Sequence, residues 1–541
     1  MVRNAEGRTR LRPTQPAASG PTGHASDRAG APGAVHGGRW LVPVVGVVAF
    51  VARLWPVLVV GTLRGVHAYD DGVHLAIAQR LIAGVLPYRD EVFLHPPGIA
   101  VLLAPVAALA GLVGDSWSLA LARLLFMTLG AVNAMLIARI LARRGMVAAA
   151  IGGGAYALAG VTVGTEHTVF LETPINLGLL LALAAIARTG AGSPARSPVV
   201  ARALAVSGIA LGLAATFKIW VALDVVVLGA LVVARWGLPA VVRWLGWCLA
   251  GAAPVLLPFA VLARGRMWFD VLTAQSRRPL QAKDLLERLG AVGPAGDVHV
   301  PRIALTVGLV AILLLACAVA PAVVMLWRRT GPAAWPDPVW WGLLAGLQMT
   351  ALAMAPSFYF HYLAFVAPAL CLLLGAGVGH LVAAVRARGG RTARAGTAVI
   401  VAMAISGAIA LATVAPPLPT SGRVDNVVLA EFASAHDCLW ARNPSYLQVA
   451  DATARQIGRR CPATMDPVGA WLVLSAGGTV PGSRARTLDD LILDELAASD
   501  GALLAVGHTR QGLGSRSRTY LAKHFARAGR TGQIEMWTRT S

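Results

Sequence analysis

Apolar segments about 20 residues long recur along the 541-residue chain, and this feature constrains its fold more than any other. A helix needs about that length to cross the hydrocarbon core of a bilayer. Backbone polar groups find no water there, so each segment must satisfy its own hydrogen bonds. Only 13% of the residues are charged, against about 25% in a typical soluble domain. The sequence therefore predicts an all-α polytopic membrane bundle.

The arginines between these segments predict their orientation, because basic residues concentrate in cytoplasmic loops. The basic segment before the first span places the N-terminus inside. If residues 98–114 lie in or along the outer leaflet instead of crossing, most of the other arginine-rich loops also fall inside. This arrangement has about 11 spans, or about 13 if one pair has been merged, with the C-terminus outside. The predicted spans are 40–61, 117–142, 147–165, 172–188, 203–219, 220–236, 239–262, 302–326, 338–355, 361–384 and 396–415.

The two ends of the chain differ in composition from its apolar middle, 39–415. Residues 1–38 are rich in Gly, Pro, Ala and Arg without an apolar period, so we expect a disordered cytoplasmic tail. Residues 416–541 are polar with alternating segments, which predicts a small extracytoplasmic mixed α/β domain. Cys438 and Cys461 lie there, and an oxidising compartment favours a disulfide between them. Two separate buried thiols are the alternative.

The net charge of +21 does not indicate a nucleic-acid partner, because the arginines are spread over short loops between spans. One loop, residues 263–301, breaks the charge rule, since it is basic and yet outside in this topology. It either meets an anionic partner, such as a lipid headgroup or a phosphate, or forms a solvated interfacial helix. Arg277 and Arg278 lie in this loop and are candidate phosphate ligands.

Other polar residues gather at the outer ends of the predicted spans. Ionisable side chains in or beside a span are costly and indicate function by default. Each also has an ordinary alternative, such as helix capping for Asp70 or interfacial anchoring for His361. Together they predict one cluster of carboxylates and imidazoles at the outer surface. Its members are Asp70, Asp71, His74, His95, Glu166, His167, Glu172, Lys218, Tyr359, His361 and Tyr362.

The first outer loop, residues 62–97, holds the densest part of this cluster. Its stretch DDGVHLAIAQRLIAG starts with two acids, has apolar residues at helical spacing and ends at Gly84. This pattern predicts a short amphipathic helix lying on the membrane. Asp70 and Asp71 stand at its N-terminus, where the helix dipole favours an ionised carboxylate. An ionised carboxylate at the surface suits a general base that activates a hydroxyl nucleophile.

The longer stretch AYDDGVHLAIAQRLIAGVLPYRDEVFLHPPG resembles the first outer loop of the GT-C superfamily of membrane glycosyltransferases, which includes protein O-mannosyltransferases and lipid A aminoarabinose transferases. Those enzymes carry an Asp-Glu pair and then a His-Pro-Pro or Lys-Pro-Pro turn, and here Asp70-Asp71 and His95-Pro96-Pro97 take these places. Three further motifs fit the family over about residues 40–415. They are Glu172 in GTEHTVFLETP, Lys218 at the end of GLAATFK, and the aromatic-His-Tyr stretch FYFHY.

The resemblance implies an enzyme of the plasma (inner) membrane that moves a sugar of the mannose or arabinose type. The donor would be a polyprenyl-phosphate sugar, and the acceptor a hydroxyl on a lipid, glycan or protein outside, attacked with inversion. Asp70 would act as the base, while Asp71 and Glu172 would orient the sugar or the base. The expected phosphate or lipid contacts are His95, Lys218, Arg277 and Arg278. The expected substrate-binding residues are His74, Glu166, Tyr359 and His361.

No defined metal signature is present in the sequence, although a divalent metal at the acidic cluster is conceivable. Two non-enzymatic alternatives remain at this stage. A secondary transporter usually has internal repeats and polar groups near the midplane, and neither pattern is evident. A non-catalytic envelope scaffold would not need the Asp70-Asp71 pair.

Overall fold

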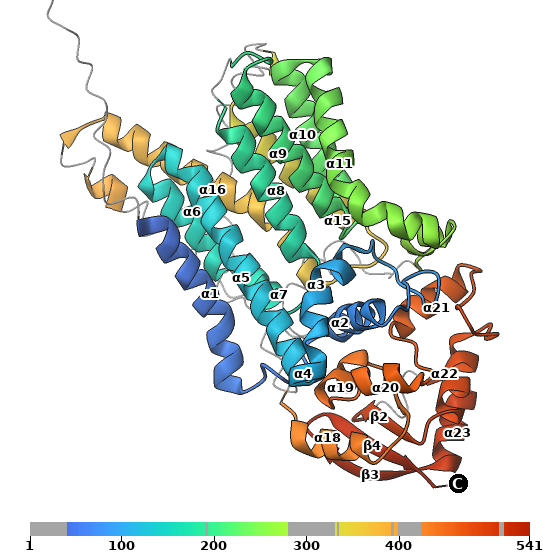
Figure 1. Ribbon diagram of the computed structural model, residues 1–541. Coiled ribbons are helices and arrows are strands. Elements are labelled where there is room, and N and C mark those ends of the chain that lie inside the picture. Colours follow the sequence, from blue (N-terminus) through green and yellow to red (C-terminus); the bar gives the residue numbers. More distant parts are fainter. Residues whose placement is uncertain are drawn as a thin grey trace, which may run out of the picture. The chain divides into compact units, whose positions relative to one another are not determined.

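The structure is a computed structural model built mainly from helices (Figure 1). It describes residues 40–189, 193–279, 331–332, 335–390, 394–398, 423–507 and 513–540. Several predicted segments lie outside the described residues, and their predictions are untested. They are the tail 1–38, the basic loop beyond residue 279, the span 302–326 and most of the span 396–415.

Most of the predicted spans correspond to helices with ends within a few residues of the predicted ones. By length and composition, five of the described helices could cross a membrane, or up to six if the bent pair α6 and α7 counts as one span. This agrees with a helical membrane bundle, while the number of about 11 spans stays a prediction. The bundle helices are α1 (Leu41–Val60), α5 (Asp115–Leu141), α6 (Met146–Leu158), α7 (Gly160–Glu166), α8 (Glu172–Ala187), α9 (Pro198–Ala215), α10 (Val221–Trp236), α11 (Leu238–Leu262), α15 (Asp337–Met354) and α16 (Ala367–Ala387).

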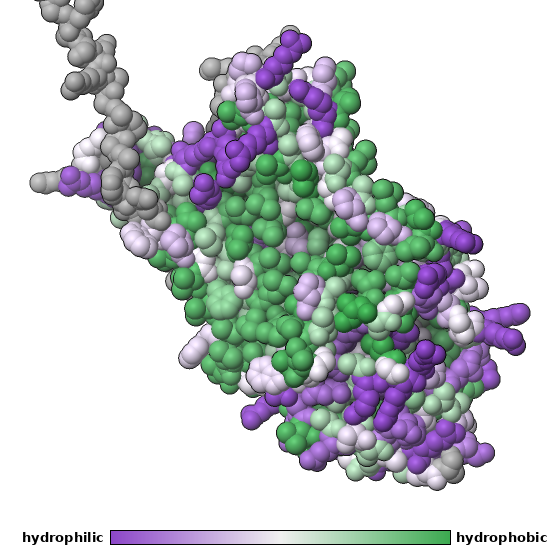
Figure 2. All heavy atoms as spheres, viewed as in Figure 1, coloured by the Kyte–Doolittle hydropathy of each residue, from purple (hydrophilic) through white to green (hydrophobic). Residues whose placement is uncertain are grey.

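The bundle helices approach one another through small residues. Helix α5 packs against α1, α6 and α8, and α9 packs against both α8 and α11. A Cβ at Gly212 of α9 would overlap the carbonyl oxygen of Cys248 in α11. Small residues allow such close packing in lipid, where no hydrophobic effect drives helices together. Figure 2 shows apolar residues covering much of the bundle on the visible face, while hydrophilic residues gather over the C-terminal region.

One predicted span is broken into two helices. Helices α6 and α7 meet at Ala159 and are bent by 54°. Thr162 Oγ1 donates to the freed carbonyl oxygen of Tyr156 at 2.6 Å. Arg53 Nη1 donates to the next carbonyl, that of Ala157, at 3.0 Å. Irregular backbone at membrane depth is tolerated where buried protein groups satisfy it, and these two side chains do so.

The predicted surface helix of the first loop is a helix, but it is not at a surface. Helix α2 (Tyr69–Ile82) is buried from Asp71 to Gln79. It packs against α3 (Gly98–Ala108) and α19 (Pro444–Val449) (Figure 1). The short helix α4 (Ala110–Val113) follows α3. The prediction that α2 lies on the membrane is therefore wrong, because both its apolar and its polar side chains have protein neighbours.

Two helix boundaries place polar residues at chain breaks. Residues 216–220 separate α9 from α10, so α9 ends before the predicted residue 219 and Lys218 lies in the break. The predicted span 361–384 starts later, with α16, because Phe360–Phe365 forms a 3₁₀ turn of its own. His361 therefore lies in a turn instead of at the start of a long helix. Lys218 and His361 both line the cavity described below.

The C-terminal region, described residues 423–507 and 513–540, has the predicted mixed α/β structure. Its four strands form one sheet in the order β1-β2-β4-β3, in which β1 and β2 are parallel and the other neighbours antiparallel. Helices α19 and α20 lie between this sheet and the bundle (Figure 1). The elements are α18 (Asn426–Ser434), β1 (Leu439–Ala441), α19, α20 (Thr453–Arg459), α21 (Pro467–Ser475), α22 (Leu488–Ala497), β2 (Gly501–Ala505), α23 (Ser515–His524), β3 (Phe525–Thr531) and β4 (Ile534–Arg539).

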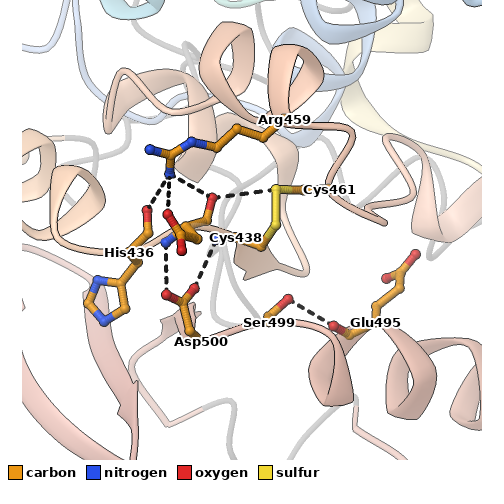
Figure 3. Close-up of a disulfide and its surroundings, with 8 residues drawn as sticks. His436, Cys438, Arg459, Cys461, Glu495, Ser499 and Asp500 are labelled. Carbon is orange, nitrogen blue, oxygen red and sulfur yellow. Dashed lines mark hydrogen bonds and ion pairs between the residues drawn. A yellow bond between two sulfur atoms is a disulfide. The ribbon is translucent and has the colours of Figure 1, made fainter.

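The predicted disulfide is confirmed. Cys438 and Cys461 are bonded, with their Cα atoms 5.6 Å apart (Figure 3). Arg459 Nη1 donates to the carbonyl oxygen of His436 at 3.1 Å, and the backbone N–H of Cys438 donates to Asp500 Oδ1 at 2.8 Å. The bond and these contacts tie the end of α20 to the start of β1, and so fix the chain that leads to α21.

Candidate active site

A cavity of about 840 Å³ lies where the first loop, the bundle and the C-terminal region meet. Its walls come from the start of α2, the loop before α3, the start of α8, the break between α9 and α10, and the 3₁₀ turn before α16. The π-helical segment Phe269–Ala274 and the start of α21 complete it. Predicted site residues from six separate segments line this one cavity. They are Asp70, His74, His95, Glu172, Lys218, Arg278, Tyr359 and His361.

Asp70 presents a free carboxylate to the cavity. It is the second residue of α2, and the N-cap position belongs to Ala68, so capping does not explain Asp70. Its half-buried carboxylate makes no hydrogen bond with any residue that the structure describes. Burial and the nearby charge of Glu172 raise its pKa to about 6, against the opposing effect of Lys218. Such a carboxylate is largely ionised at neutral pH and can accept a proton.

Asp71 has a different position from its neighbour, and it does not line the cavity. Arg123 of α5 donates to Asp71 Oδ2 from Nη2 at 2.7 Å and from Nε at 3.0 Å, and both residues are fully buried. The backbone N–H of Val169 donates to Asp71 Oδ1 at 2.7 Å. The carbonyl of Val169 lies 2.7 Å from His74 Nδ1. Asp71 thus joins α2 to α5 and to the segment that contacts His74, so it does not reach the cavity itself. The role predicted for it, orienting the sugar or the base, stays a prediction.

Glu172 and Lys218 form a buried ion pair at the cavity wall. Lys218 Nζ lies 2.5 Å from Glu172 Oε1, 3.7 Å from the ring centre of Trp220 and 4.4 Å from that of Tyr362. An ammonium over aromatic faces is stabilised by the ring quadrupole. The two rings and the carboxylate together fix the position of the cation. Trp220 and Tyr362 also line the cavity, and no sequence pattern had pointed to Trp220.

Three histidines face the same cavity. The His74 and His95 ring centres are 5.7 Å apart, and His361 stacks on Phe170 at 4.0 Å. Burial lowers the pKa of His74, holds that of His95 well below its usual range, and lowers that of His361 to about 4. They are therefore neutral at pH 7. His95 can act as a hydrogen-bonding group, but it does not supply the positive charge that a phosphate contact was predicted to need.

Arg277 and Arg278 are adjacent in sequence but lie in different surroundings. Arg278 lines the cavity, with Nη2 3.1 Å from the Tyr359 hydroxyl and its guanidinium 5.6 Å from that ring centre. Arg277 does not line it, and its Nη1 donates to the carbonyl of Ala476 at 2.8 Å. Of the two predicted phosphate ligands, the structure brings only Arg278 to the site.

Glu166 also lies away from the cavity, although a substrate contact was predicted for it. It is fully buried in the bundle and forms an ion pair with Arg53. Its Oε1 accepts from the Tyr156 hydroxyl at 2.6 Å and from Asn133 Nδ2 at 3.3 Å. These partners satisfy the carboxylate within the protein. Its position next to the break in the bundle indicates a structural role.

Asp466 of the C-terminal region also lines the cavity, although it is not among the site residues predicted from the sequence. Asp466 Oδ1 accepts from the Tyr69 hydroxyl at 2.9 Å, and Tyr69 is the first residue of α2. Burial raises the pKa of Asp466 to about 6, although the N–H of Gly469 and the Tyr69 hydroxyl oppose this effect. The pattern Asp466-Pro467 does indicate a helix start. Nothing in the pattern indicates a contact almost 400 residues away.

The described residues include no group of three or more His, Cys, Asp and Glu side chains placed to hold a metal ion. The acidic wall contains a lysine ammonium instead, paired with Glu172. These donors do not fit the divalent metal that the acidic cluster had suggested, and we derive no step through one.

No protein-family model matches the chain, and no curated protein matches it in sequence. Solved structures do match over most of its length. ArnT from Cupriavidus metallidurans bound to undecaprenyl phosphate has a TM-score of 0.57 at 16% identity, covering 93% of this chain and 98% of that one. AglB from Archaeoglobus fulgidus, in complex with an inhibitory peptide and a dolichol-phosphate, has a TM-score of 0.58 at 12% identity, covering 87% and 70%. The chain therefore has the fold of these two proteins over most of its length, which confirms the predicted GT-C fold.

Proposed function

We propose that this chain is a membrane glycosyltransferase that moves a sugar from a polyprenyl-phosphate donor to an acceptor hydroxyl. One observation carries the proposal: a single cavity holds the free carboxylate of Asp70 together with the cations Lys218 and Arg278. A base and a phosphate-binding pair are the two elements that such a transfer needs. The polyprenyl phosphates bound to the similarly folded ArnT and AglB support this class of donor.

The donor phosphate is assigned to the cationic side of the cavity. Lys218 is fixed by Glu172 and two aromatic rings, and Arg278 is oriented by Tyr359. Fixed cations stabilise the charge that develops on a leaving phosphate. The lipid tail stays in the bilayer beside the bundle, which brings the anomeric carbon near Asp70. Mannose and arabinose remain the two sugar types that we expect.

The reaction proceeds by direct displacement. Asp70 accepts the proton of the acceptor hydroxyl while the acceptor oxygen forms a bond to the anomeric carbon. The bond between that carbon and the phosphate oxygen breaks, and its electron pair leaves with the lipid phosphate. The configuration at the carbon inverts. The neutral imidazoles of His74, His95 and His361 offer hydrogen bonds to sugar hydroxyls without adding charge. We place this site on the outer face of the plasma membrane.

The test measures sugar transfer in nanodiscs from labelled polyprenyl-phosphate-mannose and polyprenyl-phosphate-arabinose to a crude cell-envelope extract. Asp70→Asn keeps the side-chain shape and removes the base, so transfer should fall by about 100-fold or more. Asp494→Asn makes the same chemical change at an exposed position on α22, and it should transfer like the wild type. Equal rates for Asp70→Asn and wild type would exclude Asp70 as the base. A folded wild type that neither transfers from nor binds either donor would exclude this function and favour a transporter or a scaffold.

A further inference from the structure

The C-terminal region contributes a carboxylate of its own, Asp466, to the cavity. Helix capping accounts for only one of its two oxygens. Asp466 is the N-cap of α21, and its Oδ1 accepts from the backbone N–H of Gly469 at 2.8 Å. The same oxygen accepts from the Tyr69 hydroxyl at 2.9 Å, while that hydroxyl accepts from the N–H of Val468 at 3.0 Å. All of these contacts use Oδ1, so the role of Oδ2 is left to be explained.

Asp466 Oδ2 makes no hydrogen bond with any residue in the described part of the chain, although Asp466 is only 5% exposed. This oxygen keeps accessible surface at the cavity wall, where a carboxylate oxygen can accept a hydrogen bond from a bound ligand. A Cβ at position 469 would overlap this oxygen, so the glycine leaves room for the carboxylate at the cavity wall. A donor group from outside the protein can satisfy Oδ2 there.

The surrounding charges indicate which kind of ligand this is. Lys218 and Arg278 give the cavity a cationic side, whereas Asp466 interacts with the charges of Asp70 and His74. A negative carboxylate repels a phosphate, and it binds neutral hydroxyl or amine donors well. Because α21 belongs to the polar C-terminal region and not to the bundle, a group arriving from water reaches Asp466 without entering the lipid.

We propose that Asp466 binds the acceptor, accepting a hydrogen bond from a second hydroxyl or amine next to the one that reacts. This inference rests on the proposed function. Asp70 then takes the proton from the reacting hydroxyl while Asp466 fixes the direction of approach. Tyr69 joins the two carboxylates, because it precedes Asp70 in α2 and binds Asp466 directly. The acceptor class is therefore a compound with at least two adjacent donor groups, such as a glycan or polyol.

The test uses the full-length protein in nanodiscs and titrates the cell-envelope extract at saturating labelled donor. Asp466→Asn keeps a good N-cap but removes the charge. The amount of extract that gives half the maximal rate should rise about 10- to 100-fold, because binding loses a hydrogen bond to a charged group. The donor KM should stay unchanged. Asp466→Ser also keeps a cap without the carboxylate and should behave alike. Asp425→Asn is the matched control, since Asp425 caps α18 away from the cavity.

Several outcomes would overturn the inference. An unchanged half-saturating amount of extract in both folded variants would leave Asp466 as a cap only. A lower maximal rate with an unchanged half-saturating amount would make it a positioning residue for Asp70. A raised donor KM would place it on the sugar. A wild type inactive with every donor removes the proposed function and this inference with it, whereas an active wild type with normal variants removes only the inference.

Discussion

Asp70 and Asp71 show how strongly a single position along a helix decides the role of a side chain. Successive residues of an α-helix point about 100° apart. Asp70 therefore faces the cavity without a hydrogen-bond partner among the described residues, while Asp71 faces Arg123 and Val169 in the protein interior. Removing one member of a buried ion pair leaves the other charge uncompensated. We therefore expect loss of Asp71 to act on folding and, under the proposed function, loss of Asp70 to act on the transfer step.

The raised pKa of Asp70 gives the transfer rate a defined pH dependence. A general base works only when deprotonated, so the rate should rise with pH through the Asp70 pKa of about 6 and then level off. At pH 5 the rate should be about a tenth of the plateau. Glu172→Gln removes a negative neighbour that raises this pKa and frees Lys218, which lowers it. The rising limb should therefore move to lower pH in rate profiles measured at saturating donor.

Asp494→Asn serves as the control in this pH series, because its exposed side chain is remote from the cavity. Its profile should overlay that of the wild type. A wild-type limb near pH 4, the ordinary carboxyl range, would contradict the argument that burial and Glu172 raise the Asp70 pKa. A limb that stays in place in Glu172→Gln would show that another group titrates.

The sequence predicted several of the residues that line the cavity, but it did not distinguish them from carboxylates that lie elsewhere. Residue type and spacing were enough to select Asp70, Glu172, Lys218 and His361, because polar side chains at span ends need a reason to be there. The same argument could not separate Asp71 or Glu166 from them. Those carboxylates are satisfied by arginines distant in the sequence, and hydropathy carries no information about such partners.

At the scale of elements, the contact between α2 and α19 joins the first loop to the C-terminal region. Gly72 of α2 meets Ser445 so closely that a Cβ would overlap the Ser445 backbone nitrogen. The backbone N–H of Gly72 also donates to Ser445 Oγ at 3.1 Å. The glycine is therefore the residue that permits this contact, and its replacement tests whether the contact matters.

Gly72→Ala should destabilise the protein and reduce transfer. Helix propensity alone predicts the opposite sign, since alanine stabilises a helix interior by about 1 kcal/mol relative to glycine. The clash with backbone at Ser445 should outweigh that gain, because neither helix can yield without moving Asp70 or the C-terminal region. The measurements are thermal unfolding and protease resistance of the C-terminal region in nanodiscs.

Gly111→Ala is the matched control, because Gly111 is also helical and a Cβ there meets nothing within 4 Å. It should be neutral or slightly stabilising. A Gly72→Ala variant more stable than wild type, with full activity, would show that the α2–α19 contact adapts freely and does not hold the site together.

Helix positions followed from the sequence because an apolar span has a length and charged ends that can be read directly. Tertiary partners decided the exceptions. The break at Ala159 is stabilised by Thr162 nearby and by Arg53, which is 104 residues from its partner Ala157. Helix α2 is buried because both α3 and the C-terminal helix α19 pack on it, and α19 is remote in the sequence. A helix with a mixed pattern fits a membrane surface and a protein interface equally well, so the pattern alone could not decide for α2.

At the scale of the whole molecule, the cavity is complete only with the C-terminal region in place. Asp466 and Val468 form part of its wall. Further contacts hold the region to the bundle: the N–H of Ser116 donates to Asp451 Oδ1 at 2.7 Å, and Gln448 Nε2 donates to Gln79 Oε1 at 2.8 Å. The sequence predicted a separate outer domain of unassigned role. The structure makes it part of the site, because those polar residues meet partners more than 300 positions away.

The disulfide therefore should influence transfer although it lies outside the cavity. Cys438 and Cys461 are 23 residues apart in the sequence. A disulfide across a loop of this length restricts the unfolded chain and stabilises the folded state by about 3 kcal/mol. Replacing both with serine should destabilise the C-terminal region. Hydrogen exchange measures this directly: amides of the C-terminal region should lose protection, while those of the bundle helices should keep it. Because Asp466 follows Cys461 closely, the half-saturating amount of acceptor extract should rise, and the donor KM should stay unchanged. Cys248→Ala, which removes a free thiol of the bundle, is the control. A double variant with wild-type acceptor use and a destabilised C-terminal region would contradict this coupling, because it would mean that transfer does not need that region held against the bundle.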